Sequence, residues 1–227
     1  MFTSAPDKPF LVIEAATTAG SVALVQGRDV FGEVAVTMGV GREDQLFPAI
    51  CALLEEAGLT VSSLGGVVCG AGPGSFTSLR IAAALAKGLA HGANLPLFAL
   101  SSLWLAAAAL REPGQYVVHA DALRLERYAQ PITVTEDGVV SPDAAVLRLS
   151  AQDLVALSAA RTRVAVLATS TPEIDKRVIT PVAANLVYCD SAWSMVPVSL
   201  DRWEPDYGRL AEAQVKWESM HGVSLAW

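Results

Sequence analysis

Residues 66–90 read GVVCGAGPGSFTSLRIAAALAKGLA, and this stretch decides the fold. Val67 and Val68 are β-branched and lie in an apolar run, which indicates a buried strand. The Gly-Pro-Gly segment at 72–74 predicts a tight turn, because glycine reaches backbone angles closed to other residues and proline fixes φ. Ser75 can then cap a helix. The stretch is therefore expected to form a strand, a turn and a helix.

The helix expected at 79–90 is apolar on most of its faces. Arg80 and Lys87 are its charged residues, and most of the others are alanine or glycine. An amphipathic surface helix shows a single apolar stripe. Two interpretations stay open: either the helix is enclosed by its own domain, or one face packs on a sheet and another on a second protein.

The glycine turn is also a candidate anion-binding loop, formed by Gly72, Gly74, Ser75 and Phe76. Free N–H groups at a helix N-terminus attract anions. The loop is not a P-loop, because no Gly-Lys-Ser/Thr follows it. Ser75 has no histidine nearby in the sequence and no Gly-x-Ser-x-Gly elbow, which disfavours a peptidase.

Composition narrows the class of protein. The chain has 227 residues, enough for one large domain or two small ones. Apolar residues make up 52% and charged residues 17%, and the mean hydropathy is +0.41. This composition indicates that some apolar surface is buried or covered by another protein. Charged residues and prolines interrupt the richest apolar part, so we expect no membrane span. The net charge of −7 disfavours strong independent binding to nucleic acid.

The cysteines and histidines give no metal-binding pattern. Cys51, Cys69 and Cys189 are widely spaced in apolar surroundings, which predicts buried free thiols in a reducing compartment. The three histidines show no helical zinc spacing. The cysteine and histidine patterns therefore predict no metal site. The N-terminal residues show no basic segment followed by an apolar run, so we expect a cytoplasmic protein.

The first half predicts a mixed sheet covered by helices. Strands are expected at 10–13, 21–25, 30–37, 66–71 and 97–100, the first three as an antiparallel meander. Helices are expected at 45–57 and 103–110, besides the one after the glycine turn. The helix at 45–57 carries Leu46, Ile50 and Leu54 at helical spacing, and Phe47 and Cys51 widen its stripe.

The second half echoes this order in a shortened form. Strands are expected at 116–120, 126–132, from 134 onward, at 164–168 and at 185–188, with helices at 151–160 and 209–220. We therefore predict two lobes, an N-terminal lobe at 1–112 that carries the interaction helices and a shortened C-terminal lobe at 113–227.

Four motifs resemble one family. IEAATTAGSVAL at 13–24 is similar to IDTST-x-x-x-SVAL, and GPGSFTSLRI at 72–81 resembles the more specific GPGSFTGLRI. DALRLERY at 121–128 is similar to DAR-x-GE-x-Y, and PDYGRLAEA at 205–213 to P-x-Y-x-R-x-x-EA. The motifs occur in the expected order, and the family they resemble is TsaB, also called glycoprotease-like.

The resemblance implies an actin-like ATPase (ASKHA) architecture of class α/β, with two ribonuclease-H-like lobes. It implies a non-catalytic dimerization subunit in tRNA threonylcarbamoyladenosine biosynthesis, supporting a TsaD catalytic subunit that modifies adenosine 37. Its expected partners are the TsaD homologue and a TsaE-type ATPase, with a homodimer when alone, tRNA only through the complex, and no cofactor.

The resemblance also implies which residues act. Pairing uses the helices at 45–57 and 76–91, so the expected interface comprises Leu46, Phe47, Ile50, Leu54, Phe76, Leu79, Arg80, Ala83, Ala86, Lys87 and Ala90. Glu14 and Thr17 belong to a degenerate phosphate motif, in which Glu14 replaces the usual aspartate and two alanines replace its hydroxyl neighbours. The alternative function is an ATP- or phosphate-binding enzyme of the actin-like kinase or acyltransferase type that uses the glycine turn.

Overall fold

The computed structural model describes residues 7–39, 45–122, 125–166, 177–189, 195–207 and 220–221. Its first sheet has five strands in the order β3-β2-β1-β4-β5. The strands are β1 (Phe10–Glu14), β2 (Ala19–Gln26), β3 (Asp29–Thr37), β4 (Gly66–Gly70) and β5 (Leu97–Leu100). All five were predicted from the sequence, and each predicted strand end lies within two residues of the observed one.

Strand direction in this sheet follows from the connections. The tight turns between β1, β2 and β3 give antiparallel pairs, with Val12 opposite Ala23. β1, β4 and β5 are parallel, with Val12 beside Val68 and Val68 beside Phe98. Helices α1 (Leu46–Glu56) and α2 (Phe76–Gly92) connect the parallel strands, together with a short 3-10 turn, η1 (Val61–Ser63). The predicted meander followed by helix-linked strands is therefore confirmed.

The second sheet repeats this plan. Its main path is β11-β10-β6-β7-β8, and β9 also pairs with β7. The strands are β6 (Gly114–Asp121), β7 (Glu126–Val134), β8 (Val140–Pro142), β9 (Leu147–Ser150), β10 (Thr162–Val166) and β11 (Val178–Ile179). β6 pairs antiparallel with β7 and parallel with β10, as β1 does with β2 and β4. The mixed α/β architecture with two similar sheets is as expected.

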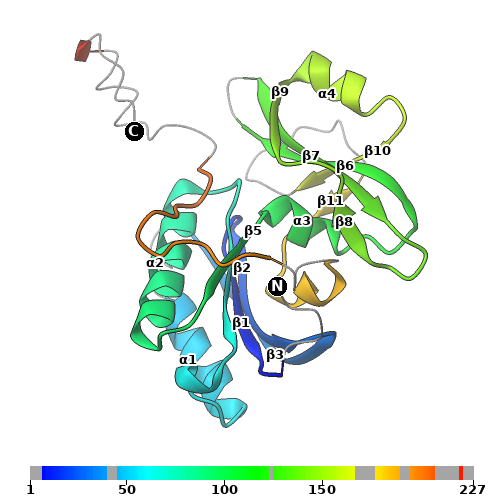
Figure 1. Ribbon diagram of the computed structural model, residues 1–227. Coiled ribbons are helices and arrows are strands. Elements are labelled where there is room, and N and C mark those ends of the chain that lie inside the picture. The colour runs from blue at the N-terminus through cyan, green and yellow to red at the C-terminus, as the bar shows by residue number, and fades with distance from the viewer. Residues whose placement is uncertain are drawn as a thin grey trace.

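The two interaction helices cover one face of the first sheet (Figure 1). Leu11, Ile13 and Val67 point from the strands to this face. They pack against the inward side chains of α1 and α2, which include Ile50 and Ala86. Burial of this apolar surface holds both helices on the sheet.

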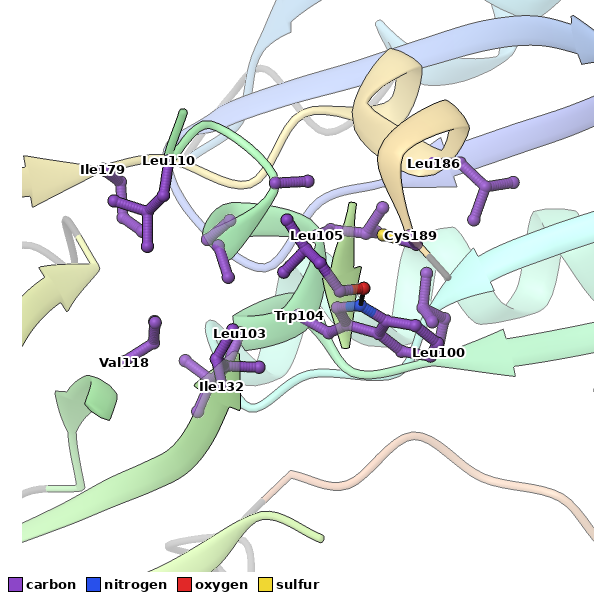
Figure 2. Close-up of a cluster of buried hydrophobic side chains, with 14 of the residues drawn as sticks. Leu100, Leu103, Trp104, Leu105, Leu110, Val118, Ile132, Ile179, Leu186 and Cys189 are labelled. Carbon is purple, nitrogen blue, oxygen red and sulfur yellow. Dashed lines mark hydrogen bonds between the residues drawn. The ribbon is translucent and has the colours of Figure 1, made fainter. Parts of the chain in front are cut away.

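Helix α3 (Ser102–Ala107) lies between the two sheets (Figures 1 and 2). All six of its residues are buried, and one hydrophobic cluster joins it to Val12 in the first sheet and Val118 in the second. The Trp104 indole N–H donates to the Val140 carbonyl at 2.8 Å, shown dashed in Figure 2. The two lobes therefore share a core, and we propose the boundary between them at residue 112, after α3.

Two expectations for the second half need comment. Residues 185–188 were predicted as a strand, but Ala183–Tyr188 form a 3-10 helix, η2, so that prediction is wrong. Its short apolar run packs Ala183 and Leu186 into the shared core, and such a run does not distinguish strand from helix. Helix α4 (Ala151–Leu157) is capped by Ser150 as predicted, because the Ser150 hydroxyl accepts the Asp153 N–H at 3.1 Å.

Three further points complete the fold. The predicted closing helix at 209–220 lies almost wholly outside the described residues. Segment 195–207 runs beside α2 without regular secondary structure (Figure 1, orange). In the parts of the chain that the structure describes, no helix is long and apolar enough to span a bilayer.

Candidate functional site

The glycine turn packs tightly against the turn between β1 and β2. The Ser75 N–H donates to the Ala16 carbonyl at 2.8 Å, and a Cβ on Gly74 would lie 2.3 Å from that same oxygen. Gly72 has a φ of +88°, a value that favours glycine. Glycine is thus required at both positions, once for the close approach and once for the backbone angle.

A buried hydrogen-bond network connects the glycine turn to Ser102 and Glu14. The Gly72 N–H donates to the Ser102 hydroxyl at 3.1 Å, and this hydroxyl donates to Glu14 Oε2 at 2.9 Å. Glu14 Oε1 accepts the Ala16 N–H at 2.6 Å. The longer Glu14 side chain fits because Gly70 has none: a Cβ there would lie 2.0 Å from Glu14 Oε2.

The electrostatics of this network follow from its burial. Glu14 is fully buried, and desolvation raises its pKa to about 7, although the hydrogen bonds from Ala16 and Ser102 favour the ionised form. Burial, with a smaller contribution from Glu14, also raises the pKa of the neighbouring Cys69 thiol. The acid of the first-strand motif is therefore an internal group.

Several of the groups expected to bind phosphate form hydrogen bonds within the protein itself. The hydroxyl of Thr17 exchanges hydrogen bonds with the backbone of Ala19, and both Glu14 oxygens accept internal donors. The N–H groups of Gly72 and Ser75 likewise donate to protein oxygens. Ser75 lies at the N-cap position of α2 as predicted, but its hydroxyl accepts from Ser78 and not from a helical N–H. The anion-binding role of the loop stays a prediction.

The residues predicted for the interface divide into two groups. Seven are buried within the chain's own core: Leu46, Ile50, Leu54, Leu79, Ala83, Ala86 and Ala90. Phe47 is 51% exposed and Arg80 is exposed, whereas Phe76 and Lys87 are half-buried. The structure places the predicted helices side by side on the sheet, but most of the named side chains point toward the sheet.

The outward face of the two helices includes Phe47 and Arg80 from the predicted set, together with residues that were not predicted for the interface. The exposed residues of α1 are Phe47, Pro48, Cys51, Ala52, Glu55 and Glu56, and those of α2 are Thr77, Arg80, Ala84, Gly88, His91 and Gly92. Ile81 and Leu85 on α2 are half-buried. A Cβ on Gly88 would meet no described atom within 4 Å. The sequence did not indicate this face, because a helix that is apolar on most sides does not show which side packs on the sheet and which side faces outward. Cys51, predicted to be buried, is exposed here, so that prediction is wrong.

Segment 195–207 forms a strap along α2. The Val198 N–H donates to the Leu97 carbonyl and the Asp206 N–H to the Ala71 carbonyl, each at 2.8 Å. Trp203 packs against the hydrophobic cluster on the α2 side of the first sheet. The strap therefore borders the outward face of α2.

Side chains of the strap also contact α2 directly. The rings of Phe76 and Tyr207 lie 4.7 Å apart, so motifs separated by 130 residues meet. The Arg80 guanidinium lies 5.2 Å from the centre of the Phe76 ring. Lys87 Nζ lies 5.8 Å from the centre of the Trp203 ring. Both cations of α2 thus rest on aromatic rings.

A hollow lies between the strap and the second sheet. It has a volume of about 360 Å³ and is lined by Tyr128, Arg148, Asp206 and Tyr207, among others. Arg148 forms an ion pair with Glu126. Among the described residues, no three His, Cys, Asp or Glu side chains gather as metal ligands would.

Part of the chain is similar in sequence to a family model and to several known proteins. Residues 42–144 match the family model described as TsaD: tRNA N6-adenosine threonylcarbamoyltransferase. The chain is 35% identical over 120 residues to an uncharacterized protein of Mycobacterium bovis, covering 52% of this chain and 56% of the relative. It is 33% identical over 132 residues to the tRNA threonylcarbamoyladenosine biosynthesis protein TsaB of Escherichia coli, covering 57% of each. The chain thus spans little more than half of the length of these curated relatives.

Solved structures establish the fold over a longer stretch. A Pseudomonas aeruginosa protein described as similar to peptidase YeaZ superimposes with a TM-score of 0.73 at 24% identity, covering 89% of this chain and 100% of that one. YeaZ from Pseudomonas aeruginosa gives 0.72 at 24% identity, covering 88% and 99%. The described core is therefore the fold of these proteins.

Proposed function

We propose that the chain is a member of the TsaB family and a non-catalytic assembly subunit of the tRNA threonylcarbamoyladenosine modification complex. In this proposal it pairs with a TsaD-type subunit and supports catalysis at adenosine 37 without carrying out chemistry itself. The observation that carries the proposal is the outward face of α1 and α2.

This face has the properties of a surface for packing helices. Ala84 and Gly88 lie four residues apart, one turn along α2, and their small side chains let another helix approach closely. Phe47 is a large apolar residue, and 51% of its surface is exposed to water in the isolated chain. Covering it would remove apolar area from water, which favours association.

The inward-turned phosphate motif supports the non-catalytic part of the proposal. A nucleotide-binding enzyme of this architecture needs an acid and free donors that point into the cleft. Here Glu14 is buried and accepts internal hydrogen bonds, and the turn donates two N–H groups to protein oxygens. A phosphate would have to displace these contacts, so we favour assembly over the kinase or acyltransferase alternative.

The remaining partners follow as parts of the same proposal. A TsaE-type ATPase joins the assembly, tRNA is contacted through the complex, and in the absence of TsaD the same face joins two copies of this chain. We place the complex in the cytoplasm, where the free thiols of Cys51, Cys69 and Cys189 stay reduced.

The test is a charge placed on the outward face. In Ala84→Arg, a long cation stands where a helix should approach, so complex formation with the TsaD-type subunit of the same organism should fall at least tenfold. Ala156→Arg is the matched control, because Ala156 is an exposed alanine on α4 in the other lobe. Equal affinity of both variants, measured by calorimetry on folded protein, would contradict the proposal.

A further inference from the structure

The two cations of α2 have no acidic partner within the described chain. α2 contains no aspartate or glutamate, and no described carboxylate lies within 4.0 Å of Arg80 or Lys87. The two residues are seven positions apart, about two helical turns, and so lie on the same side of α2. Five other arginines of the described chain do form ion pairs with acids, namely Arg28, Arg127, Arg148, Arg161 and Arg177.

Each cation is held in place by an aromatic ring. Arg80 lies over Phe76, whose ring is itself packed on Tyr207, and Lys87 lies over Trp203. These contacts limit the rotamers of two otherwise flexible side chains without neutralising them. A partner that binds them therefore loses less conformational entropy than it would with freely moving cations.

We propose that Arg80 and Lys87 bind two carboxylates on one helix of the TsaD-type partner, spaced about two turns apart along that helix. This inference rests on the proposed function, and it names the chemistry by which α2 recognises its partner. Arg80 and Lys87 border the small-residue face at Ala84, so a helix packed there would reach both cations.

The surroundings favour carboxylates of a protein over phosphates of a nucleic acid. The strap beside the two cations carries Asp201, Glu204 and Asp206, and the whole chain has a net charge of −7. Glu204 is close enough to help raise the pKa of Tyr207, after the larger effect of burial. A polyanion would meet these acids along its length, whereas two single carboxylates can avoid them.

Helices α1 and α2 of a second copy, within their described bounds, do not offer the matching pair. Its α2 has no acid, and the acids of its α1 are Glu55 and Glu56, which are adjacent in the sequence and cannot lie two turns apart. The electrostatic contact should therefore distinguish the heterodimer from the homodimer.

The experiment measures the affinity of the full chain for its TsaD-type subunit at low and high salt. Arg80→Gln and Lys87→Gln remove each charge and keep most of each stem, and Arg28→Gln is the control, an exposed arginine on the β2–β3 turn. We expect each test variant to weaken the complex about fivefold at low salt and the double variant more than tenfold, with smaller losses at high salt. The control should bind like wild type.

Each outcome has a distinct meaning. If the wild-type chain forms no complex, the proposed function fails. If it forms one that both test variants leave unchanged at low salt, this inference is overturned while the proposed function stands. The inference is also overturned if the variants weaken self-association equally, or if they weaken binding of the isolated chain to tRNA and leave the partner affinity intact.

Discussion

The buried Glu14 carboxyl makes the stability of the protein depend on pH in a defined direction. Its pKa is about 7 in the folded chain, raised by burial from an ordinary value of 4.5. Below pH 4.5 both the folded and the unfolded chain hold the proton. As the pH rises from 4.5 toward 7, the unfolded chain releases it first, so the free energy of unfolding falls.

The magnitude follows from the two pKa values. The gap between 4.5 and about 7 corresponds to roughly 3.4 kcal/mol at about 1.36 kcal/mol per pH unit. Between pH 5 and pH 8, Glu14 should therefore remove roughly 2.5 kcal/mol from the free energy of unfolding. The loss is nearly complete above pH 7, where the folded chain must hold a buried charge.

Glu14→Gln isolates this effect, because the amide keeps the size of the side chain and does not titrate. Urea unfolding of both proteins, followed by tryptophan fluorescence from pH 5 to pH 8, gives the two free energies. We expect the wild-type protein to lose roughly 2.5 kcal/mol relative to the variant over this range. Glu33→Gln, at an exposed position on β3, is the control and should run parallel to wild type. A wild-type-to-variant gap that changes by less than about 0.5 kcal/mol would refute the reasoning.

Other substitutions and probes test separate parts of the structure. Leu105→Ala, in the helix between the sheets, should lower the free energy of unfolding by roughly 2–5 kcal/mol in urea titration, and a loss below about 1 kcal/mol would mean that this core relaxes easily. Gly74→Ala should lower the melting temperature in calorimetry, because its Cβ would lie 2.3 Å from a carbonyl oxygen; an unchanged melting temperature would contradict the tight packing of the turn. A thiol reagent should modify Cys51 in the folded protein and reach Cys69 and Cys189 only in denaturant, since both are buried; fast reaction of either in the native state would contradict the fold.

The elements of the first lobe could be predicted because local signals agreed with the tertiary structure. β-branched runs marked β1, β2 and β4, and the Gly-Pro-Gly turn marked the start of α2. Burial on both faces makes such strands continuous apolar runs, which are easy to recognise. The sequence predicted α1 and α2 as helices, and their role in binding a partner was implied by the family resemblance and stays a prediction.

The orientation of those helices was not available. One face of these helices meets the sheet, and the other carries alanine, glycine and Phe47, so their sequence is apolar on most sides. Only the structure shows which face meets the sheet. Ala86 was a natural choice for an interface by composition, yet it is fully buried, whereas Ala84 two positions away is exposed. The 3-10 helix η2 was missed for a related reason, since a short apolar run fits a strand equally well.

Contacts between distant segments also escaped sequence reasoning. The link from Glu14 through Ser102 to the glycine turn joins three segments of the first lobe. The packing of Tyr207 on Phe76 brings the strap to α2. In both cases the separate motifs were recognised, but nothing local indicates that they meet.

The mass of the complex formed by this chain and the TsaD-type subunit of its own organism tests the central claim most directly. Light scattering on the mixed, purified proteins should give one species with the summed mass of the two subunits, and Ala84→Arg should abolish it while the Ala156→Arg control retains it. Two separate folded species in the wild-type mixture, at micromolar concentration and low salt, would contradict the claim that α1 and α2 exist to bind another subunit.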